Sequence, residues 1–294
     1  MASIKACKTG SLILGTAAFG QAYGVFVQEK AVGAEEVEAL IKLARSSGFN
    51  GIDTADNYGN SLNNLEAVSL PDIRIYHKIN VTNQSSNVLV ANARDVCMRL
   101  GVEVLEAVSI HNTDFIYLND SAVFSTFSNL LNIKNLGFAK KIGISLYLPE
   151  DITRINNLGI DFDIIQIPLC PGDGRWAYAI EVAKARGIEV HARSVLLQGV
   201  LANKEVTVSE RLSDIEVLRK KWFAYCDEYQ VDPVSAAVQN VLSVDGIDKV
   251  VLGLVSEMQF NSLIKGLEKV VPHSFEGALT SVQLDVRTWN TKTS

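Results

Sequence analysis

The sequence lacks the cysteine and histidine patterns that mark disulfide-stabilised or metal-binding proteins. Its four cysteines, Cys7, Cys97, Cys170 and Cys226, are widely separated and form no CxxC pair. Only four histidines occur, and none stands in an HxH or HExxH arrangement. Disulfide frameworks and zinc sites both need paired or closely spaced ligands. We therefore expect reduced, mostly buried thiols and no bound metal, which argues against a metal-dependent isomerase or hydrolase.

Long apolar stretches and an excess of basic residues are also missing. The N-terminal segment MASIKACKTG has no long apolar core, and no later stretch offers about 18 uncharged apolar residues for a membrane span. We therefore expect a cytoplasmic protein that makes no contact with a membrane. The formal net charge is −6, which gives no basic footprint for nucleic acid. Small molecules are the expected ligands, and the oligomeric state is left open.

No low-complexity tract, charge block or linker rich in proline and glycine divides the 294 residues. A chain of this length with 48% hydrophobic side chains can bury a large core. We therefore expect a single domain over residues 1–294.

Short apolar runs rich in β-branched residues recur along the chain, as strands buried on both faces require. They are SLILGTA, NGIDTA, RIYHKIN, LEAVSIHN, KKIGIS, FDIIQIP, IEVHARS and DKVVLGL. Helical spacing of apolar residues separates them, over 34–46, 84–100, 121–136, 149–158, 175–186, 212–229 and 256–269. A further helix is predicted within 230–244, with Asp232 as its cap and Pro233 in its first turn.

Alternation of strands and helices predicts a parallel sheet built from βαβ units. Eight such repeats favour a (β/α)8 TIM barrel, whose active site lies at the carboxyl ends of the strands. The rival is a doubly wound open sheet, which needs a GxGxxG turn after the first strand. The sequence GTAAFG at that place lacks the spacing, so the barrel is the preferred fold.

Ionisable side chains occur where three consecutive predicted strands end. Asp53 closes the second strand, Tyr58 follows it in the loop, Lys78 lies near the end of the third, and His111 closes the fourth. Each has an ordinary structural explanation: a helix cap, a loop aromatic, an exposed strand end and a core histidine. Their joint position at one rim of the barrel favours a catalytic site instead.

These four side chains suit the reduction of a carbonyl group. Hydride transfer leaves an alkoxide that must be protonated, so an acid is needed beside the oxygen. A tyrosine with an ordinary pKa near 10 becomes a better donor when a nearby ammonium stabilises the phenolate. Lys78 would supply that charge, Asp53 would hold Lys78, and His111 would orient the substrate oxygen.

The segment GIDTADNYGNS, residues 51–61, resembles the hallmark segment of the aldo-keto reductase superfamily. In that family, an aspartate and a tyrosine of this segment, a strand-three lysine and a strand-four histidine form the catalytic tetrad. Asp53, Tyr58, Lys78 and His111 match all four in order and in strand. The resemblance spans essentially the whole chain, from LILGTAAFG to VVLGLVSEMQ, and implies NAD(P)H-dependent hydride transfer to or from an aldehyde, a ketone or a sugar-like alcohol.

The same resemblance implies a nicotinamide dinucleotide extended across the barrel mouth without a Rossmann domain. Ser145 and Gln166 would bind the carboxamide, although without the tetrad both read as ordinary caps of strand ends. Gly15, Thr16 and Ala17 would form the floor beside the nicotinamide, and Arg193 would stack on it. Ser194 and Leu196 would contact the pyrophosphate. The adenosine phosphate would lie against Gly253, Ser256, Glu257 and Gln259.

Three positions depart from the family pattern. Leu146 follows the strand-five serine where the family often has asparagine, and Arg193 stands where a tyrosine commonly stacks on the nicotinamide. The last helix begins LVSEMQ, with Glu257 and no basic residue to bind a 2′-phosphate. NADP(H) is expected on family grounds, with NAD(H) as the alternative.

On the substrate side, the loop LCPGDGRW with Trp176 resembles that of members linked to bacterial sugar pathways, although a tryptophan more commonly packs between helices. Phe19, Tyr23 and Asn112 are further candidates for the substrate pocket. A sugar-like or small polar aldehyde is the expected substrate. A cofactor-binding regulatory subunit without significant turnover is the alternative function, and the complete tetrad argues against it.

Overall fold

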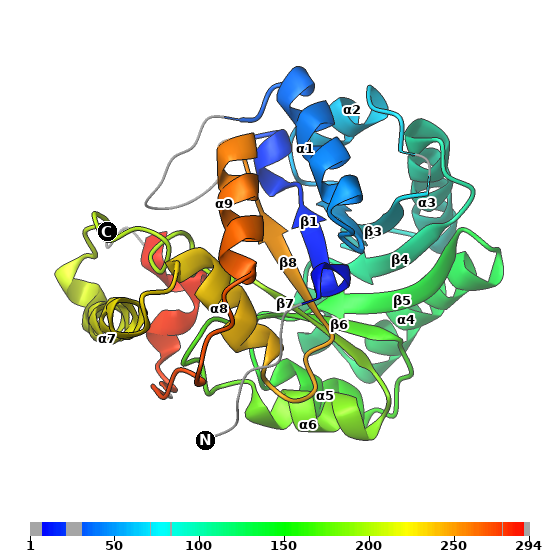
Figure 1. The fold of residues 1–294 in the computed structure, drawn as a ribbon. Coiled ribbons are helices and arrows are strands. Elements are labelled where there is room, and N and C mark those ends of the chain that lie inside the picture. The colour runs from blue at the N-terminus through cyan, green and yellow to red at the C-terminus, as the bar shows by residue number, and fades with distance from the viewer. Residues whose placement is uncertain (1–7, 22–30, 71, 83, 278, 291–294) are drawn as a thin grey trace.

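The eight predicted strands form a closed parallel barrel in the computed structural model (Figure 1). The structure describes residues 8–21, 31–70, 72–82, 84–277 and 279–290. Each strand pairs in parallel with its neighbours in the sequence, and β1 pairs with β8 to close the barrel. The strands are β1 (Leu12–Gly15), β2 (Gly51–Ala55), β3 (Arg74–Ile79), β4 (Leu105–Ile110), β5 (Ala139–Ser145), β6 (Ile164–Pro168), β7 (Glu189–Arg193) and β8 (Lys249–Gly253).

Helices surround the barrel, and every helix predicted from the sequence is present within a few residues of its predicted bounds (Figure 1). They are α1 (Ala34–Ser46), α3 (Ser86–Leu100), α4 (Asp120–Asn135), α5 (Asp151–Asn157), α6 (Ala177–Ala185), α7 (Ser213–Tyr229), α8 (Pro233–Leu242) and α9 (Glu257–Leu267). The predicted cap of α8 is confirmed, because the Asp232 carboxylate accepts a 2.8 Å hydrogen bond from the Ser235 amide and Pro233 opens the helix.

The sequence patterns did not predict the short helix α2 (Ser61–Glu66) or the turns of 3₁₀ helix at Val282–Leu284 and Val286–Asn290. A helix of six residues that contains two asparagines has too few apolar positions to show a helical period. α2 nevertheless matters for function, because it begins three residues after Tyr58 and fixes the end of that loop.

Among the described residues, three packed regions support the barrel, the smallest of which is formed by Ile13, Tyr76, Ala107, Ile164 and Val251 of the strands. The largest lies between the outer strand faces and the helices, and includes Leu14, Val108 and Ile165. The second joins α7, α8 and the C-terminal segment around the buried side chain of Trp222, whose indole nitrogen donates to the Leu201 carbonyl. In Figure 1 the red C-terminal segment lies beside α7, away from the centre of the barrel.

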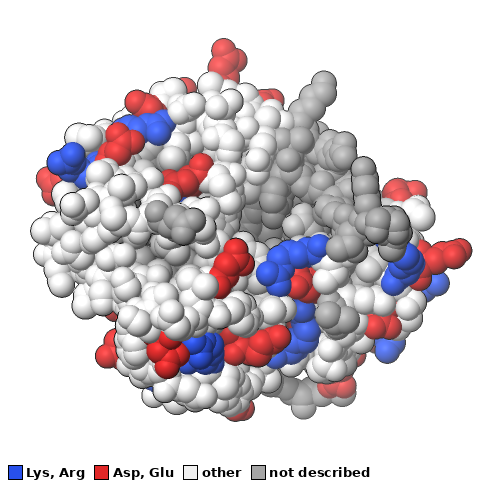
Figure 2. Space-filling view, turned by 180° about the vertical axis from the view of Figure 1, so that it is seen from behind, with Lys and Arg blue, Asp and Glu red and all other residues white. Residues whose placement is uncertain are grey.

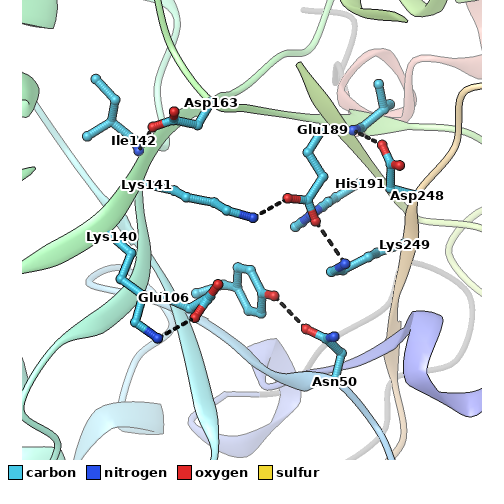
Figure 3. A network of polar contacts seen from close by, with 12 residues as sticks. Asn50, Glu106, Lys140, Lys141, Ile142, Asp163, Glu189, His191, Asp248 and Lys249 are labelled. Carbon is cyan, nitrogen blue, oxygen red and sulfur yellow. Dashed lines mark hydrogen bonds and ion pairs between the residues drawn. The ribbon is translucent and has the colours of Figure 1, made fainter. Parts of the chain in front are cut away.

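A network of charged side chains occupies the amino-terminal end of the barrel, opposite the strand ends predicted to be catalytic (Figure 3). Glu189 lies at its centre, and its carboxylate pairs with the side chains of Lys141, Lys249 and His191. Burial opposes ionisation of Glu189, but hydrogen bonds from these three groups outweigh it and hold the pKa of Glu189 well below its usual range. We call these four residues the floor network.

Cys97, Cys170 and Cys226 are free and buried, as predicted, and Cys7 lies outside the described residues. Within the described part of the chain, no helix combines the length and apolar character needed to cross a bilayer. On the face shown in Figure 2, basic side chains lie next to acidic ones, with broad uncharged areas between them.

Candidate active site

Asp53 and Lys78 form a buried ion pair inside the carboxyl end of the barrel. Asp53 lies on β2 and Lys78 on the neighbouring β3, and both side chains are almost completely excluded from solvent. Burial lowers the pKa of Lys78, and the nearby guanidinium of Arg193 lowers it further, while the Asp53 carboxylate opposes both effects. Removing either partner would leave an uncompensated charge in the barrel.

Tyr58 lies against this pair, in the loop between β2 and α2. The Nζ of Lys78 is 5.0 Å from the centroid of the Tyr58 ring. The His111 ring meets the Tyr58 ring edge to face, with centroids 5.6 Å apart. His111 follows β4 directly, and its amide donates a 2.8 Å hydrogen bond to the carbonyl of Ile79. The structure therefore brings together all four predicted catalytic side chains.

The imidazole of His111 is neutral at physiological pH. Burial is the main reason, and the positive charge of Lys78 adds to it; together they lower the pKa of His111 to about 3. A neutral imidazole carries one N–H donor, so it can hydrogen-bond a substrate oxygen without delivering a full charge to it.

Gln166 crosses the barrel mouth from β6 to reach Asp53. Its Nε2 donates a 2.8 Å hydrogen bond to Asp53 Oδ2. A carboxylate only accepts, so the amide nitrogen must face Asp53 and the amide oxygen must face away. That oxygen, Gln166 Oε1, is buried and has no hydrogen-bond partner among the described residues. It is therefore an acceptor available to a ligand.

Hydroxyl groups beneath the site hold the Tyr58 loop to the barrel. Thr16 Oγ1 donates to the backbone carbonyl of Asp53 at 3.0 Å, and Ser61 Oγ donates to Thr16 Oγ1 at 2.9 Å. The loop also packs against Gly20, where an added Cβ would lie 2.1 Å from the Tyr58 carbonyl oxygen. Sequence reasoning missed Gly20 and Ser61, because their role depends on close approach and not on chemistry visible in a motif.

A cavity of about 500 Å³ opens beside Tyr58 and Asp53 and extends to α9. Eight of the twelve predicted cofactor residues line it: Gly15, Ala17, Gln166, Arg193, Ser194, Leu196, Gly253 and Gln259. The loop after β7 and the start of α9 add residues that the sequence did not indicate, among them Gln198, Asn203 and Ser262. Such a volume is typical of small-molecule and cofactor sites.

The other four predicted cofactor residues do not line this cavity. Thr16 and Ser145 are fully buried, where Thr16 supports Asp53 and Ser145 accepts a 3.3 Å hydrogen bond from Arg193 Nε. Ser256 caps α9 by accepting from the Gln259 amide, and Glu257 is exposed in the first turn of that helix.

The predicted substrate residues are less well placed than the tetrad. Phe19 and Trp176 have no exposed surface and pack in the main core, because both turn inward from the short segments that carry them. Asn112 uses its amide to hold the loop after β3, by hydrogen bonds with the Val81 amide and the Thr82 hydroxyl. Tyr23 lies outside the described residues. None of these three described side chains lines the cavity.

Metal ligands do not gather in the structure. Across the described ranges, no three histidine, cysteine, aspartate or glutamate side chains come together in a way that would hold a metal ion. The barrel mouth instead offers a carboxylate already paired with an ammonium, a tyrosine and a neutral imidazole.

Comparison with known proteins finds aldo-keto reductases. A curated aldo-keto reductase of Mycolicibacterium smegmatis is 29% identical over 149 residues, which cover 47% of this chain and 51% of that protein. This chain therefore aligns with only about half the length of that relative.

Solved structures share the fold at low sequence identity. The holo form of an aldo-keto reductase from Bacillus halodurans superposes with a TM-score of 0.72 and 17% identity, covering 94% of this chain and 95% of that one. A putative aldo-keto reductase from Pseudomonas aeruginosa gives 0.64 and 20%, covering 90% and 94%. A mutant of the protein Gox0644, in complex with NADPH, gives 0.64 and 18%, covering 88% and 84%.

The model of the aldo/keto reductase family matches residues 11–282, from β1 to the C-terminal segment. Because that match extends over most of the sequence and over the whole barrel, the chain belongs to the aldo/keto reductase family.

Proposed function

We propose that this protein reduces the carbonyl group of a small polar or sugar-like aldehyde with NAD(P)H, and that Tyr58 donates the proton. The observation that carries the proposal is the buried Lys78–Asp53 ion pair beside the Tyr58 ring. Burying two charges is costly even when they are paired. A barrel that only bound a dinucleotide would gain nothing from this pair, whereas a tyrosine that must release a proton at neutral pH would.

Each member of the tetrad has a distinct task in this proposal. The Tyr58 hydroxyl gives its proton to the carbonyl oxygen as negative charge develops there. The Lys78 ammonium stabilises the resulting phenolate, and Asp53 keeps Lys78 protonated in spite of its burial. His111 donates a hydrogen bond to the same oxygen from its neutral ring and so orients the substrate. Solvent then restores the proton of Tyr58.

The residues around the cavity fit a nicotinamide dinucleotide. When bound, this cofactor supplies the hydride. The unpartnered Gln166 Oε1 is the acceptor that a carboxamide N–H group needs. Gly253, at the end of β8, and Gln259, in the first turn of α9, both line the cavity, and free backbone amides at the start of a helix favour an anion.

NADP(H) is the first candidate and NAD(H) the second. The relative Gox0644 was solved with NADPH, which supports the phosphorylated form. The first turn of α9 carries Glu257 and no basic side chain, which is the feature that favours NAD(H). A titration that compares the two reduced dinucleotides decides between them.

The test is a fluorescence titration of the purified protein with NADPH and NADH, followed by an aldehyde screen. We expect saturable binding of at least one dinucleotide, and its consumption when small hydroxylated aldehydes are added. Binding of neither dinucleotide would contradict the oxidoreductase proposal. Tight binding without turnover of any carbonyl would support the regulatory-subunit alternative.

A further inference from the structure

Arg193 lies at the end of β7, and the groups that accept its hydrogen bonds are neutral. Its guanidinium donates hydrogen bonds to Ser145 Oγ at 3.3 Å, to Ser194 Oγ at 3.4 Å and to the Leu146 carbonyl at 3.1 Å. Its remaining contact is the ring of Tyr147, with the guanidinium carbon 4.6 Å from the ring centroid. Within the described ranges, no carboxylate forms an ion pair with it.

Other arginines near the barrel mouth are neutralised. Arg175 pairs with Asp173 at 2.8 Å, and Arg287 pairs with Asp285 at 2.7 Å. Arg287 also lies over the Tyr147 ring, at the same 4.6 Å as Arg193. The two guanidinium groups therefore share one aromatic neighbour but differ in charge compensation.

Arg193 therefore adds to the cavity beside Tyr58 a positive charge that no ion pair among the described residues offsets. The Asp53 carboxylate is balanced by Lys78, and His111 is neutral. The guanidinium of Arg193 has no such balance, and its field reaches the other groups, because it helps to lower the pKa of both Lys78 and His111.

Arg193 also lies where the redox-active end of a dinucleotide must be, if the proposed function holds. Tyr58 and Arg193 both line the cavity, and Arg193 is close enough to Lys78 and His111 to lower the pKa of each, whereas Gln259 lines the cavity from α9. A proton from Tyr58 and a hydride must reach the same carbonyl group. The hydride-bearing ring is therefore confined to the Tyr58 end, within the field of Arg193.

The two redox states of the cofactor differ in charge only at that ring. The oxidised nicotinamide ring is a cation, and the reduced ring is neutral. The phosphate groups are the same in both states, so their attraction to Arg193 cancels in a comparison. Uncompensated positive charge beside the ring therefore disfavours the oxidised form alone.

We propose that Arg193 makes this site selective for the reduced dinucleotide, which it binds more tightly than the oxidised form. This inference rests on the proposed function and adds a working direction to it. The site fills with the reduced cofactor when both forms are present. Once the hydride has left, repulsion between the cationic ring and Arg193 speeds release of the spent cofactor.

The test is calorimetric titration of the full chain with NADPH and with NADP⁺, in the absence of substrate. We compare the wild type with Arg193→Met, which removes the charge, and Arg193→Lys, which keeps it. Arg287→Met is the matched control, because it removes a guanidinium from the same tyrosine ring but one that Asp285 already neutralises.

We expect the wild type to bind NADPH about tenfold more tightly than NADP⁺, a difference of about 1.4 kcal/mol. The ratio should fall to about one in Arg193→Met and persist in Arg193→Lys and Arg287→Met. Equal affinities in the wild type, or an unchanged ratio in Arg193→Met, would overturn the inference. If a variant fails to fold, the ratio of the two affinities in the wild type still tests the inference. If neither NADPH nor NADP⁺ binds, the same titrations with NADH and NAD⁺ give the ratio, and binding of none of the four would instead contradict the proposed function.

Discussion

The Nζ of Lys78 lies 5.0 Å from the centroid of the Tyr58 ring, and the same Nζ is ion-paired with Asp53. A fixed ammonium at this distance favours the phenolate over the phenol. The relationship between these two residues therefore makes Tyr58 the proton donor of the proposed reaction, and it leads directly to the first prediction.

Tyr58→Phe should lower kcat by about 10² to 10⁴, the usual contribution of a general acid, and should leave dinucleotide affinity nearly unchanged. The ring is retained, so its packing against His111 should persist. Steady-state kinetics and a cofactor titration on the same preparation measure both quantities. Wild-type activity in this variant would rule out Tyr58 as the proton donor.

Asp53 and Lys78 should show strong energetic coupling. Lys78→Met leaves the Asp53 carboxylate buried without its ammonium, and we expect the free energy of unfolding to fall by about 3 to 5 kcal/mol. Asp53→Asn should lower the free energy of unfolding much less in the Lys78→Met background than in the wild type. The double-mutant cycle should therefore give a coupling energy above about 1 kcal/mol. Urea denaturation measures all four proteins.

The matched control for this cycle is the exposed pair Glu38 and Lys42, one turn apart on α1. Its coupling should be about 0.3 to 0.5 kcal/mol, as for other solvent-exposed helical pairs. A Lys78–Asp53 coupling no larger than this would show that the buried pair adds nothing to the stability of the fold.

Gly20→Ala should impair catalysis although all four side chains of the tetrad are retained. The new Cβ would lie 2.1 Å from the Tyr58 carbonyl oxygen and 2.2 Å from the Ser61 amide nitrogen, so the Tyr58 loop must shift. We expect kcat to fall about ten- to a hundredfold, as small displacements of reacting groups do. Gly10→Ala is the control, since its nearest heavy atom is 4.0 Å away. Equal activity in the two variants would contradict the positioning role.

Neutral His111 makes stability depend on pH. Its pKa is about 3 in the folded protein and near 6.5 in the unfolded chain. The unfolded state binds the extra proton between these values, so the stabilisation is complete above pH 6.5 and is lost as pH falls toward 3. We expect His111 to account for about 1 to 2 kcal/mol of the stability lost between pH 7 and pH 5.

The comparison for this prediction is His111→Asn, which cannot titrate in that range. Urea midpoints of the two proteins at pH 7 and pH 5 give the difference. The variant should lose less stability on acidification than the wild type, and His191, whose pKa burial also lowers, contributes to the slope that remains. Equal losses in both proteins would show that His111 has an ordinary pKa.

Glu189→Gln should destabilise the barrel and spare the cofactor site. Two lysines and His191 would lose their shared counter-charge at the floor network. We expect a loss of roughly 2 kcal/mol, less than for a fully buried pair because Lys141 is partly exposed. Glu106→Gln is the control, because Glu106 pairs with the more exposed Lys140. Thermal unfolding and a dinucleotide titration report the two effects separately.

The strands and most helices could be predicted because their burial leaves a pattern in the sequence. Strands covered on both faces appear as apolar runs, and α1 even begins and ends at the predicted residues. α2 could not be predicted, since six residues carry no helical period. The C-terminal turns could not be predicted either, because their side chains pack against α7, which is distant in the sequence.

The positions of the four tetrad residues could be predicted, because ionisable side chains are unusual at the ends of buried strands and so indicate a site. The contacts that support these residues could not be predicted. Thr16 and Ser145 show why. Both are buried, and the sequence does not distinguish a hydroxyl group that faces the cavity from one that lies beneath it. Phe19 and Trp176 show the same for aromatic residues, which line a pocket or fill the core according to the direction of a short loop.

The pairing of β1 with β8 means that the barrel closes only after residues as far as Gly253 have left the ribosome. The cavity beside Tyr58 is assembled from segments far apart in the sequence, from Gly15 to Leu263. A ligand that binds only the closed fold stabilises that fold and no earlier species. Under the proposed function, a dinucleotide would therefore stabilise chains in which β8 has closed the barrel and would not stabilise chains that stop before β8.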